Sequence, residues 1–287
     1  MKKLGLILAS PFIFITKYFK ACIFLLIVIL ILSFIYSGKE QGSRANLAKI
    51  YLNGPIISSD SIYNQVKKIK ENHQIKGALL IINSPGGSVS ASVEISDIIK
   101  DLNLHIPVVA YVQGTMASGS YYGGMYASKI FANRGALIGS IGVIFSGANI
   151  QGLLDKLGIQ TQGVAAGAYK EIGTFTRKWT PQEKNYIDAL IQEEYQMFIH
   201  DVAQARHLDA KKYSQFAEGK IFSAKTAKKL GLIDEVGSLD DAISELLKLS
   251  EIQEPIWLEK SKFENYLDQI TESSSKAILN TLISSLQ

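Results

Sequence analysis

The chain has very little of what metal, redox or nucleic-acid chemistry needs. It contains one cysteine, Cys22, among its 287 residues, which excludes a disulfide framework and a thiolate metal site. Its four histidines have no ligand-like spacing such as HExxH. The net charge is only +4, and no basic cluster is interleaved with aromatic residues, so there is no signature of nucleic-acid binding. These shortages favour a function without a metal, a cofactor or a nucleic-acid partner.

Charge is also absent from one long stretch near the N-terminus, residues 21–37. A membrane-spanning helix needs about 17–25 residues, so this run is at the short end of that range. The residues before it contain four lysines and no acid, and an excess of lysine marks the cytoplasmic side of a membrane. We therefore predict that residues 1–38 form a cytoplasmic segment and a single-pass transmembrane helix, with the N-terminus inside and everything after it outside the cytoplasm. A cleaved signal peptide is the weaker alternative, because no clear A-x-A site follows the run.

The chain does have enough apolar sequence to build a core. Apolar residues make up 47% and charged residues 20% of the chain, which excludes a disordered protein. Residues 39–46 are polar and contain glycine and serine, so we predict a linker there. We then predict a folded domain over residues 47–250 and a helical, amphipathic tail over residues 251–287.

Strand-like and helix-like segments alternate along the predicted domain. Apolar runs predict strands at 47–56, 76–88 and 106–114 and two short strands within 129–144, and helical spacing predicts helices at 59–72, 90–102 and 118–128. We predict a helix, a short strand, a turn and a second helix over residues 222–247. Thr180, followed by proline and by Glu183, is typical of a helix start with a capping box. The repeated β–turn–α units predict an α/β fold with a parallel sheet covered on both sides.

Two glycine-rich turns follow predicted strands, SPGGS at 84–88 and GTMASGS at 114–120. Ligands bind at the carboxyl ends of the strands in such sheets. Small residues let the backbone turn tightly and leave its N–H groups open, which suits a nucleophile, Ser118, beside an oxyanion site formed by Gly87 and Gly119. The same residues also suit plain tight turns, so the pattern alone leaves both interpretations open.

A serine nucleophile needs a base, because its hydroxyl attacks poorly until its proton is taken. No histidine occurs between His105 and His200. A lysine can act as the base if burial favours its neutral amine. Lys170 follows a run of small neutral residues, VAAGA, which would leave it poorly solvated if packed. The neighbouring Glu171 opposes this role, and a solvated surface lysine is the alternative.

Five motifs in order carry a family resemblance over roughly residues 47–247. They are INSPGGSVSASVEI, GTMASGSYYGGMYASKIFAN, GSIGVI, GAYKEIGTFTRKWTPQEK and GKIFSAKTAKKLGLIDEVGSLDDAI. Together they resemble the signal peptide peptidase A family of serine proteases, the S49 type, in its short single-domain form. The resemblance implies a ClpP/crotonase-like spiral of βαβ units and a serine–lysine dyad. It implies that Ser118 is the nucleophile, that Lys170 is the general base and that the Ser140 hydroxyl holds the lysine amine, with Gly87 and Gly119 as oxyanion donors.

The same resemblance implies a peptidase that cleaves remnant signal peptides or similar short apolar peptides at the bacterial cytoplasmic membrane, without metal or cofactor. In the short family members the lysine and the serine of one site come from neighbouring subunits, which implies a ring-like homo-oligomer. The chain departs from the usual ASGG pattern at Ser120, which stands in place of the second glycine. Ser120 therefore adds a second hydroxyl near the expected site.

Two other functions fit parts of the pattern. A crotonase-type acyl-CoA enzyme would share the fold and similar oxyanion donors, but the predicted anchor and the MASGS and AYK motifs disfavour it. A catalytically silent membrane scaffold would keep the fold alone, and the joint presence of Ser118, Ser140 and Lys170 disfavours it. A Ser-His-Asp triad of the Clp type is also disfavoured, because no histidine follows Ser118 within a couple of dozen residues.

Overall fold

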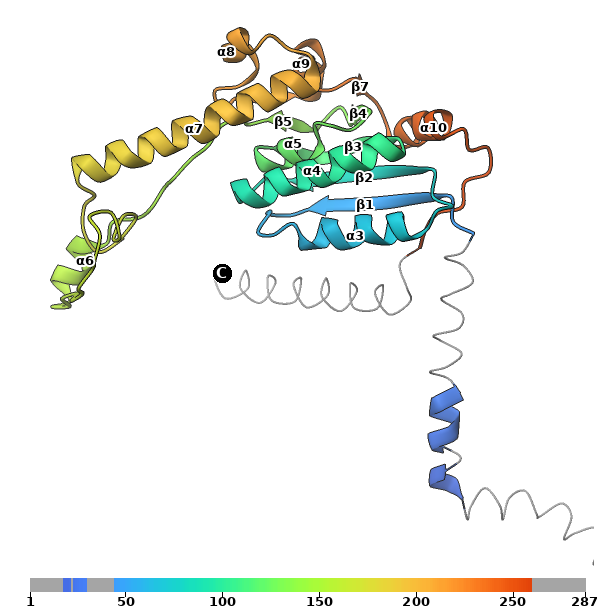
Figure 1. Cartoon of the computed structure of the whole chain (residues 1–287), viewed down its shortest axis with the longest axis horizontal. Helices are drawn as coiled ribbons and strands as arrows, with labels where there is room; N and C mark the ends of the chain where they lie inside the picture. The colour runs from blue at the N-terminus through green and yellow to red at the C-terminus, as the bar shows by residue number, and fades with distance from the viewer. Residues whose placement is uncertain (1–17, 22, 30–43, 260–287) are drawn as a thin grey trace, which may run out of the picture. The chain divides into compact units, whose positions relative to one another are not determined.

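The computed structural model describes residues 18–21, 23–29 and 44–259 (Figure 1). The chain divides into two compact units, one built from residues up to 48 and from 254 onward, the other from Lys49–Gln253. Of the predicted helical tail at 251–287, residues 251–259 form turns and a single bridge, and residues 260–287 lie outside the described residues.

The N-terminal structure corrects the predicted membrane location. Residues 19–21 and 23–29 are helical, but no helix within the described ranges is long and apolar enough to cross a membrane. The prediction of a single-pass protein with a transmembrane helix is therefore contradicted. Residues 1–17, residue 22 and residues 30–37 of the predicted anchor lie outside the described residues.

In the smaller unit, the end of the described chain runs beside the start of the first strand, β1 (Leu47–Asn53). Leu47 and Trp257 form a parallel bridge, and the Leu258 N–H donates to the Leu47 carbonyl at 2.7 Å. The Asn46 side chain accepts from the Ile256 N–H at 2.8 Å and donates to the Glu254 carbonyl at 2.9 Å. These bonds satisfy backbone groups on both short segments.

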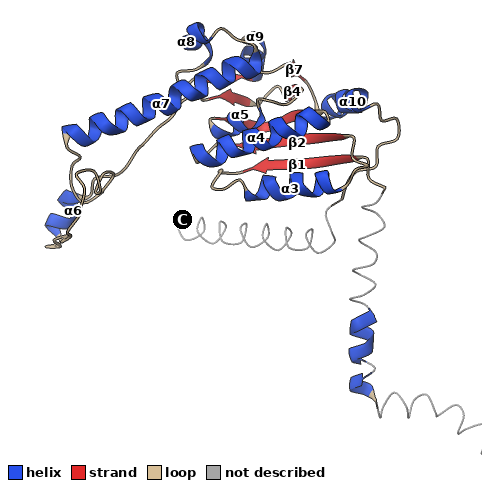
Figure 2. Cartoon of the chain, in the orientation of Figure 1, coloured by secondary structure: helices blue, strands red, loops and turns tan. Residues whose placement is uncertain are grey.

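The larger unit is an α/β fold around one seven-stranded sheet (Figure 2). The strands after β1 are β2 (Gly77–Ser84), β3 (Val108–Ala117), β4 (Lys129–Ala132), β5 (Leu137–Gly139), β6 (Ile221–Ser223) and β7 (Glu235–Val236). The order is β1-β2-β3-β4-β7, and β5 pairs with β3 and β6. The pairs β2–β3, β3–β4, β3–β5 and β4–β7 are parallel, whereas β5–β6 is antiparallel.

Apolar runs explain the central strands. Seven of the eight residues of β2 are buried, and the first half of β3 is buried throughout. Since successive residues of a strand point to opposite faces, such burial means that both faces of the sheet are covered. The helices that pack on the strands include α5 (Gly119–Gly124), which contacts β2 and β3, and α10 (Leu239–Ser250), which crosses β2, β3 and β4. The helices α3 (Asp60–Glu71) and α4 (Val89–His105) pack on each other, and α4 also packs on α5.

Strand β3 pairs with two strands, β4 and β5, along the same edge, and this pairing determines the geometry at its end. Its first half pairs with β4 and its last residues, Thr115–Ala117, pair with β5. On its other edge the register with β2 shifts, because Ile82 pairs with Val112 but Ser84 pairs with Met116. Such an irregularity re-aims the end of a strand and is common beside active sites. The register shift thus sets the position and direction of the residues that follow Ala117.

Residues 143–180, named the arm here, join β5 to the long helix α7 (Pro181–Arg206). Apart from α6 (Gln151–Lys156) the arm contains no helix or strand, and Figure 1 shows α6 beyond the start of α7, away from the strands. Only six residues of α7 are buried, four of them within Phe198–Ala203. The predicted capping box is confirmed: Thr180 accepts from the Glu183 N–H at 3.2 Å, and Glu183 accepts from the Thr180 N–H at 2.7 Å.

The remaining described helices are α8 (Tyr213–Phe216), α9 (Ala224–Lys229) and a short 3-10 helix at Ala210–Lys212. The predicted helix, strand, turn and helix over 222–247 correspond to α9, β7 and α10. The strand β6 just before α9 was not predicted. It pairs antiparallel with β5. Because it is only three residues long, its sequence is too short to show the periodic pattern that predicts a strand.

Candidate active site

Ser118 stands at the sharp turn between β3 and α5. Its backbone has φ 53° and ψ −124°, a combination that is strained for a residue with a side chain. Its N–H donates to the Gly139 carbonyl at 2.8 Å, and its own carbonyl accepts from the N–H groups of Tyr121 and Tyr122 at 3.0 and 3.1 Å. Strain held by surrounding hydrogen bonds is typical of a strand-to-helix turn that presents a nucleophilic serine.

The second glycine-rich turn lies directly against this serine. A Cβ added to Gly86 would come within 2.6 Å of the Gly119 nitrogen and 2.9 Å of the Ser118 Cβ. Gly86 also has φ +93°, which favours glycine. A Cβ on Gly119 would lie 3.3 Å from the Gly87 nitrogen, so the backbones of Gly87 and Gly119 are neighbours. Both glycine-rich turns predicted at strand ends therefore meet at one place.

The N–H groups of Gly87 and Gly119 donate no hydrogen bond within the part of the chain that the structure describes. The turn that carries Gly87 is fixed by Ile56, whose N–H donates to the Gly86 carbonyl at 2.9 Å. The Ile56 carbonyl in turn accepts from the Ser88 N–H at 2.8 Å. Two open donors on a fixed backbone beside a serine hydroxyl have the arrangement that stabilises an oxyanion.

Ser140 lies next to Ser118 at the ends of two paired strands. The register of β3 and β5 pairs Ala117 with Gly139, so the next residues of the two strands are Ser118 and Ser140. The Ser140 N–H donates to the Lys220 carbonyl at 2.7 Å, and Ser140 has φ 50°. The two serines predicted for the site are thus brought together by the sheet.

Lys170 is not brought to the serines within one chain. It lies on the arm, its side chain is exposed, and its amine makes no hydrogen bond or ion pair with the described residues. Its N–H donates to the Gly167 carbonyl at 3.1 Å as part of a turn. The neighbouring Glu171 lies 3.6 Å from Arg177, which also binds Glu183. The carboxylate that sequence reasoning set against Lys170 is therefore engaged by an arginine.

Helix α5 behind Ser118 is held by two tyrosines. The Tyr121 hydroxyl donates to the Leu232 carbonyl at 2.8 Å, and burial raises the pKa of this phenol. The Tyr122 hydroxyl donates to Asp201 on α7, and its ring packs on Phe198 with centroids 4.6 Å apart. Burial, followed by the bond to Asp201, raises the pKa of Tyr122. Both phenols therefore remain donors at neutral pH and fix α5 to its surroundings.

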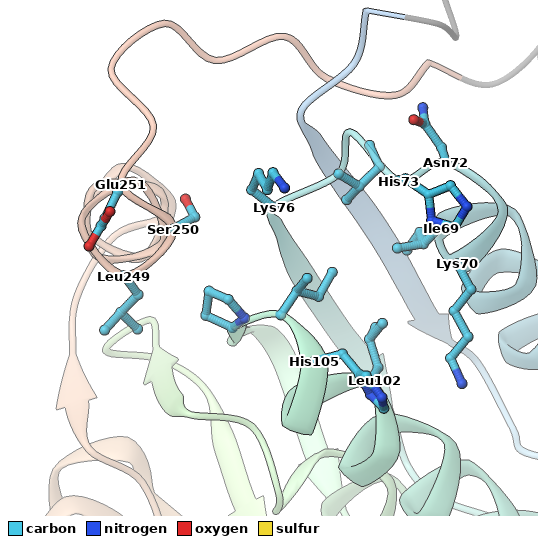
Figure 3. A pocket seen from close by; sticks show the side chains of 13 residues that line it. Ile69, Lys70, Asn72, His73, Lys76, Leu102, His105, Leu249, Ser250 and Glu251 are labelled. Carbon is cyan, nitrogen blue, oxygen red and sulfur yellow. The ribbon is translucent and has the colours of Figure 1, made fainter.

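The cavity drawn in Figure 3 lies at the opposite ends of the strands from Ser118. It has a volume of about 560 Å³, and its lining includes Lys76 and Pro107, the residues just before β2 and β3. A second hollow of about 620 Å³ lies between α4 and α7, and its lining begins at Ser88, next to Gly87. In parallel sheets ligands bind at the carboxyl ends of the strands, which is the side of the second hollow and not of the first.

Comparison with protein families matches residues 100–253 to peptidase family S49. The chain belongs to peptidase family S49. A candidate protease of Methanocaldococcus jannaschii is 35% identical over 280 residues, which are 92% of this chain and 88% of that protein. A candidate signal peptide peptidase SppA of Enterococcus faecium is 35% identical over 224 residues, 73% of this chain and 65% of that protein. Among solved structures, a ClpP1 variant from Listeria monocytogenes has a TM-score of 0.49 at 17% identity, covering 72% of this chain and 99% of its own.

In this S49 peptidase the unusual residue Ser120 does not compete as a nucleophile. Its side chain is fully buried, and its hydroxyl is bonded to the Ala117 N–H at 2.8 Å and to the Ser84 carbonyl at 2.7 Å. A hydroxyl enclosed in this way has no path to a substrate carbonyl. Of the two serines of the SGS sequence, the enclosed one is therefore Ser120, and Ser118 stays the candidate nucleophile.

Sequence reasoning missed two supports of the S49 site, Ile56 and Ser92. A Cβ on Gly119 would meet the Ser92 Oγ at 2.1 Å, so only glycine fits there, and Ser92 is fixed by donating to the Ser88 carbonyl at 2.7 Å. Ile56 acts through its backbone, which no side-chain pattern reveals. The Gly-Pro turn just before Ile56 was the available signal, because it ends a strand at the same edge of the sheet.

No group of three or more histidine, cysteine or acidic side chains within residues 18–21, 23–29 and 44–259 is arranged to hold a metal ion. The candidate site comprises Ser118, Ser140 and the backbone of Gly87 and Gly119. Its predicted base is the one member that the single chain leaves apart.

Proposed function

We propose that this S49 peptidase is a serine endopeptidase that cleaves remnant signal peptides or similar short apolar peptides with a Ser118–Lys170 dyad. The observation that carries the proposal is the meeting of the strained Ser118 with the two open N–H groups of Gly87 and Gly119. The similarity to a relative named as a candidate signal peptide peptidase supports the substrate class.

The proposed reaction is acyl transfer. The Ser118 Oγ attacks the carbonyl carbon of the scissile bond while its proton passes to the neutral Lys170 amine. The oxygen that becomes negative accepts hydrogen bonds from the Gly87 and Gly119 N–H groups, each worth about 3–4 kcal/mol of transition-state stabilisation. The C–N bond then breaks as Lys170 returns the proton to the leaving amine, and water hydrolyses the acyl-enzyme. Ser140, beside Ser118, would hold the amine in place.

The position of Lys170 supports a site shared between subunits in a ring-like homo-oligomer. The arm and the start of α7 expose apolar side chains that a monomer would leave in water. They include Ile144, Phe145, Leu153, Leu157, Val164, Phe175 and Leu190. Exposed apolar surface of this extent indicates a contact surface. Burial of the arm against a neighbouring chain would also desolvate Lys170, which favours the neutral amine that the mechanism needs.

Mixing two inactive variants tests both the dyad and its shared origin. Ser118→Ala and Lys170→Ala are each expected to lose peptidase activity and labelling by a fluorophosphonate probe. If each site takes its serine and its lysine from different chains, an equal mixture that is dissociated and reassembled regains about one quarter of the wild-type activity. Lys156→Ala, an exposed lysine on the same arm, is the matched control and is expected to stay active.

Three results would contradict parts of this proposal. Full labelling of Lys170→Ala would exclude this lysine as the base. Loss of activity in both variants without recovery on mixing would place both residues of a site in the same chain. A probe that never labels the wild-type enzyme would support a catalytically silent protein instead.

A further inference from the structure

The Ser120 hydroxyl joins the ends of the two strands that carry the site. Ser120 is the second residue of α5, and its side chain is 0% exposed. Its Oγ accepts from the Ala117 N–H at 2.8 Å. It lies 2.7 Å from the Ser84 carbonyl and 2.9 Å from the Ala117 carbonyl, either of which can receive its single proton. One buried hydroxyl therefore links the last residue of β2 with the last residue of β3.

Both linked residues lead directly into the reacting groups. Ala117 precedes Ser118, and Ser84 begins the turn that presents Gly87. The Ser84 Oγ also accepts from the Gly86 N–H at 3.2 Å, so this residue fixes the turn from both its backbone and its side chain. The strands are joined here just after their register shifts between Ile82 and Ser84. A hydrogen-bonded link at this point controls the distance between Ser118 and the Gly87 N–H group.

Helix α5 also needs a hydrogen bond to its surroundings in order to stay helical. It has six residues, and a helix that short is not stable by itself in water. Its first turn carries the Gly119 N–H, which must keep its direction to act as a donor. Because the hydroxyl of Ser120 leaves α5 one residue after Gly119, it fixes this first turn to β2. Glycine at position 120 would supply no such bond.

Not every buried serine of this region makes such bonds. Ser96 on α4 is 1% exposed, yet its hydroxyl has no hydrogen-bond partner within the described residues. Burial of a hydroxyl in this neighbourhood therefore does not by itself produce a bridge. The three contacts of Ser120 follow from its place between the strand ends.

We propose that Ser120 is a positioning residue that holds Ser118 and the Gly87 and Gly119 N–H groups in their reactive spacing through its bridge between Ser84 and Ala117. This inference rests on the proposed serine peptidase function. It predicts that the hydroxyl acts on the rate of acylation rather than on substrate binding, because Ser120 cannot touch a substrate.

Fluorophosphonate labelling of the full-length protein tests the inference. With Ser120→Ala, the maximal rate constant of labelling is expected to fall about tenfold, the effect of one lost buried hydrogen bond. The probe concentration that gives half-maximal rate, and the final fraction of labelled protein, are expected to match the wild type. An unchanged final fraction shows that the variant is folded, so a slower rate reports spacing and not loss of protein.

Ser96→Ala is the matched control, and it is expected to label at the wild-type rate. If Ser120→Ala does not reach the wild-type final fraction, Ser120→Gly removes the hydroxyl without leaving a methyl group and is measured in its place. A wild-type rate constant in the folded variant overturns the inference, and so does an equal slowing in Ser96→Ala. Failure of the proposed function is distinguishable, because the wild type would then label no faster than Ser118→Ala.

Discussion

Replacing Gly86 by alanine should both strain the backbone and displace the groups of the candidate site. The new Cβ would lie 2.6 Å from the Gly119 nitrogen, 2.7 Å from the Ala117 carbonyl oxygen and 2.9 Å from the Ser118 Cβ. Distances below 3.0 Å force a shift, and the three neighbours belong to Ala117, Ser118 and Gly119, which are the end of β3, the proposed nucleophile and a proposed donor. Gly86→Ala must therefore push the two glycine-rich turns apart.

The expected effect of Gly86→Ala has two parts, a loss of folding stability and a loss of catalytic rate. Alanine at φ +93° costs about 1–2 kcal/mol of folding stability, because side chains are disfavoured at positive φ. Moving one oxyanion donor out of line costs about 100- to 1,000-fold in kcat. The variant is therefore expected to be moderately less stable and almost inactive, and the two effects need separate measurement.

Gly54→Ala is the matched control for the first part. Gly54 also has positive φ, at +69°, but a Cβ there would have nothing within 4 Å. Gly54→Ala should show the cost of positive φ alone, Gly86→Ala should lose more thermal stability because its Cβ also clashes, and only Gly86→Ala should lose fluorophosphonate labelling and peptidase activity. Labelling of Gly86→Ala within threefold of the wild type would refute the placement of the oxyanion donors at Gly87 and Gly119.

Two further predictions concern the arm and the second serine. The Arg177 hydrogen bond, followed by the Thr180 N–H, lowers the pKa of Glu183 from 4.5 to about 2. The stabilisation that the Glu183 carboxylate contributes is therefore complete above pH 4.5 and is lost as the pH falls toward 2, and the fluorescence of Trp179 in the arm should follow this loss. Glu183→Gln should show no such transition. A transition in Glu183→Gln identical to that of the wild type would contradict the assignment. Ser140→Ala should slow labelling about fivefold if its hydroxyl holds the lysine amine, and an unchanged rate would remove Ser140 from the proposed site.

The order of elements followed well from the sequence, because local patterns determine local structure. Continuous apolar runs produced β2 and β3 close to their predicted ranges, and the Thr180–Glu183 capping box starts α7 as predicted. The helix predicted at 118–128 ends already at Gly124, and the strand predicted at 106–114 continues to Ala117. The extension of the strand comes from the pairing of Thr115–Ala117 with β5, which lies too far along the chain for a local pattern to show.

The membrane prediction was wrong for a related reason. It rested only on the uncharged, apolar composition of residues 21–37. No helix of sufficient length and apolar character occurs in the part of the chain that the structure describes. Composition was therefore an insufficient guide at this end of the chain.

The residue types of the candidate site can be read from the chain alone: a serine between small residues and a Pro-Gly-Gly turn, each after a predicted strand, and a lysine on a glycine-rich segment. Three placements appear only in the folded chain: Gly86 lies against Ser118, Ser120 is enclosed between Ser84 and Ala117, and Lys170 lies on an arm apart from both serines. The reason is physical. Side-chain identity and short-range pattern set local conformation, but the distance between turns some thirty residues apart depends on how neighbouring strands pair.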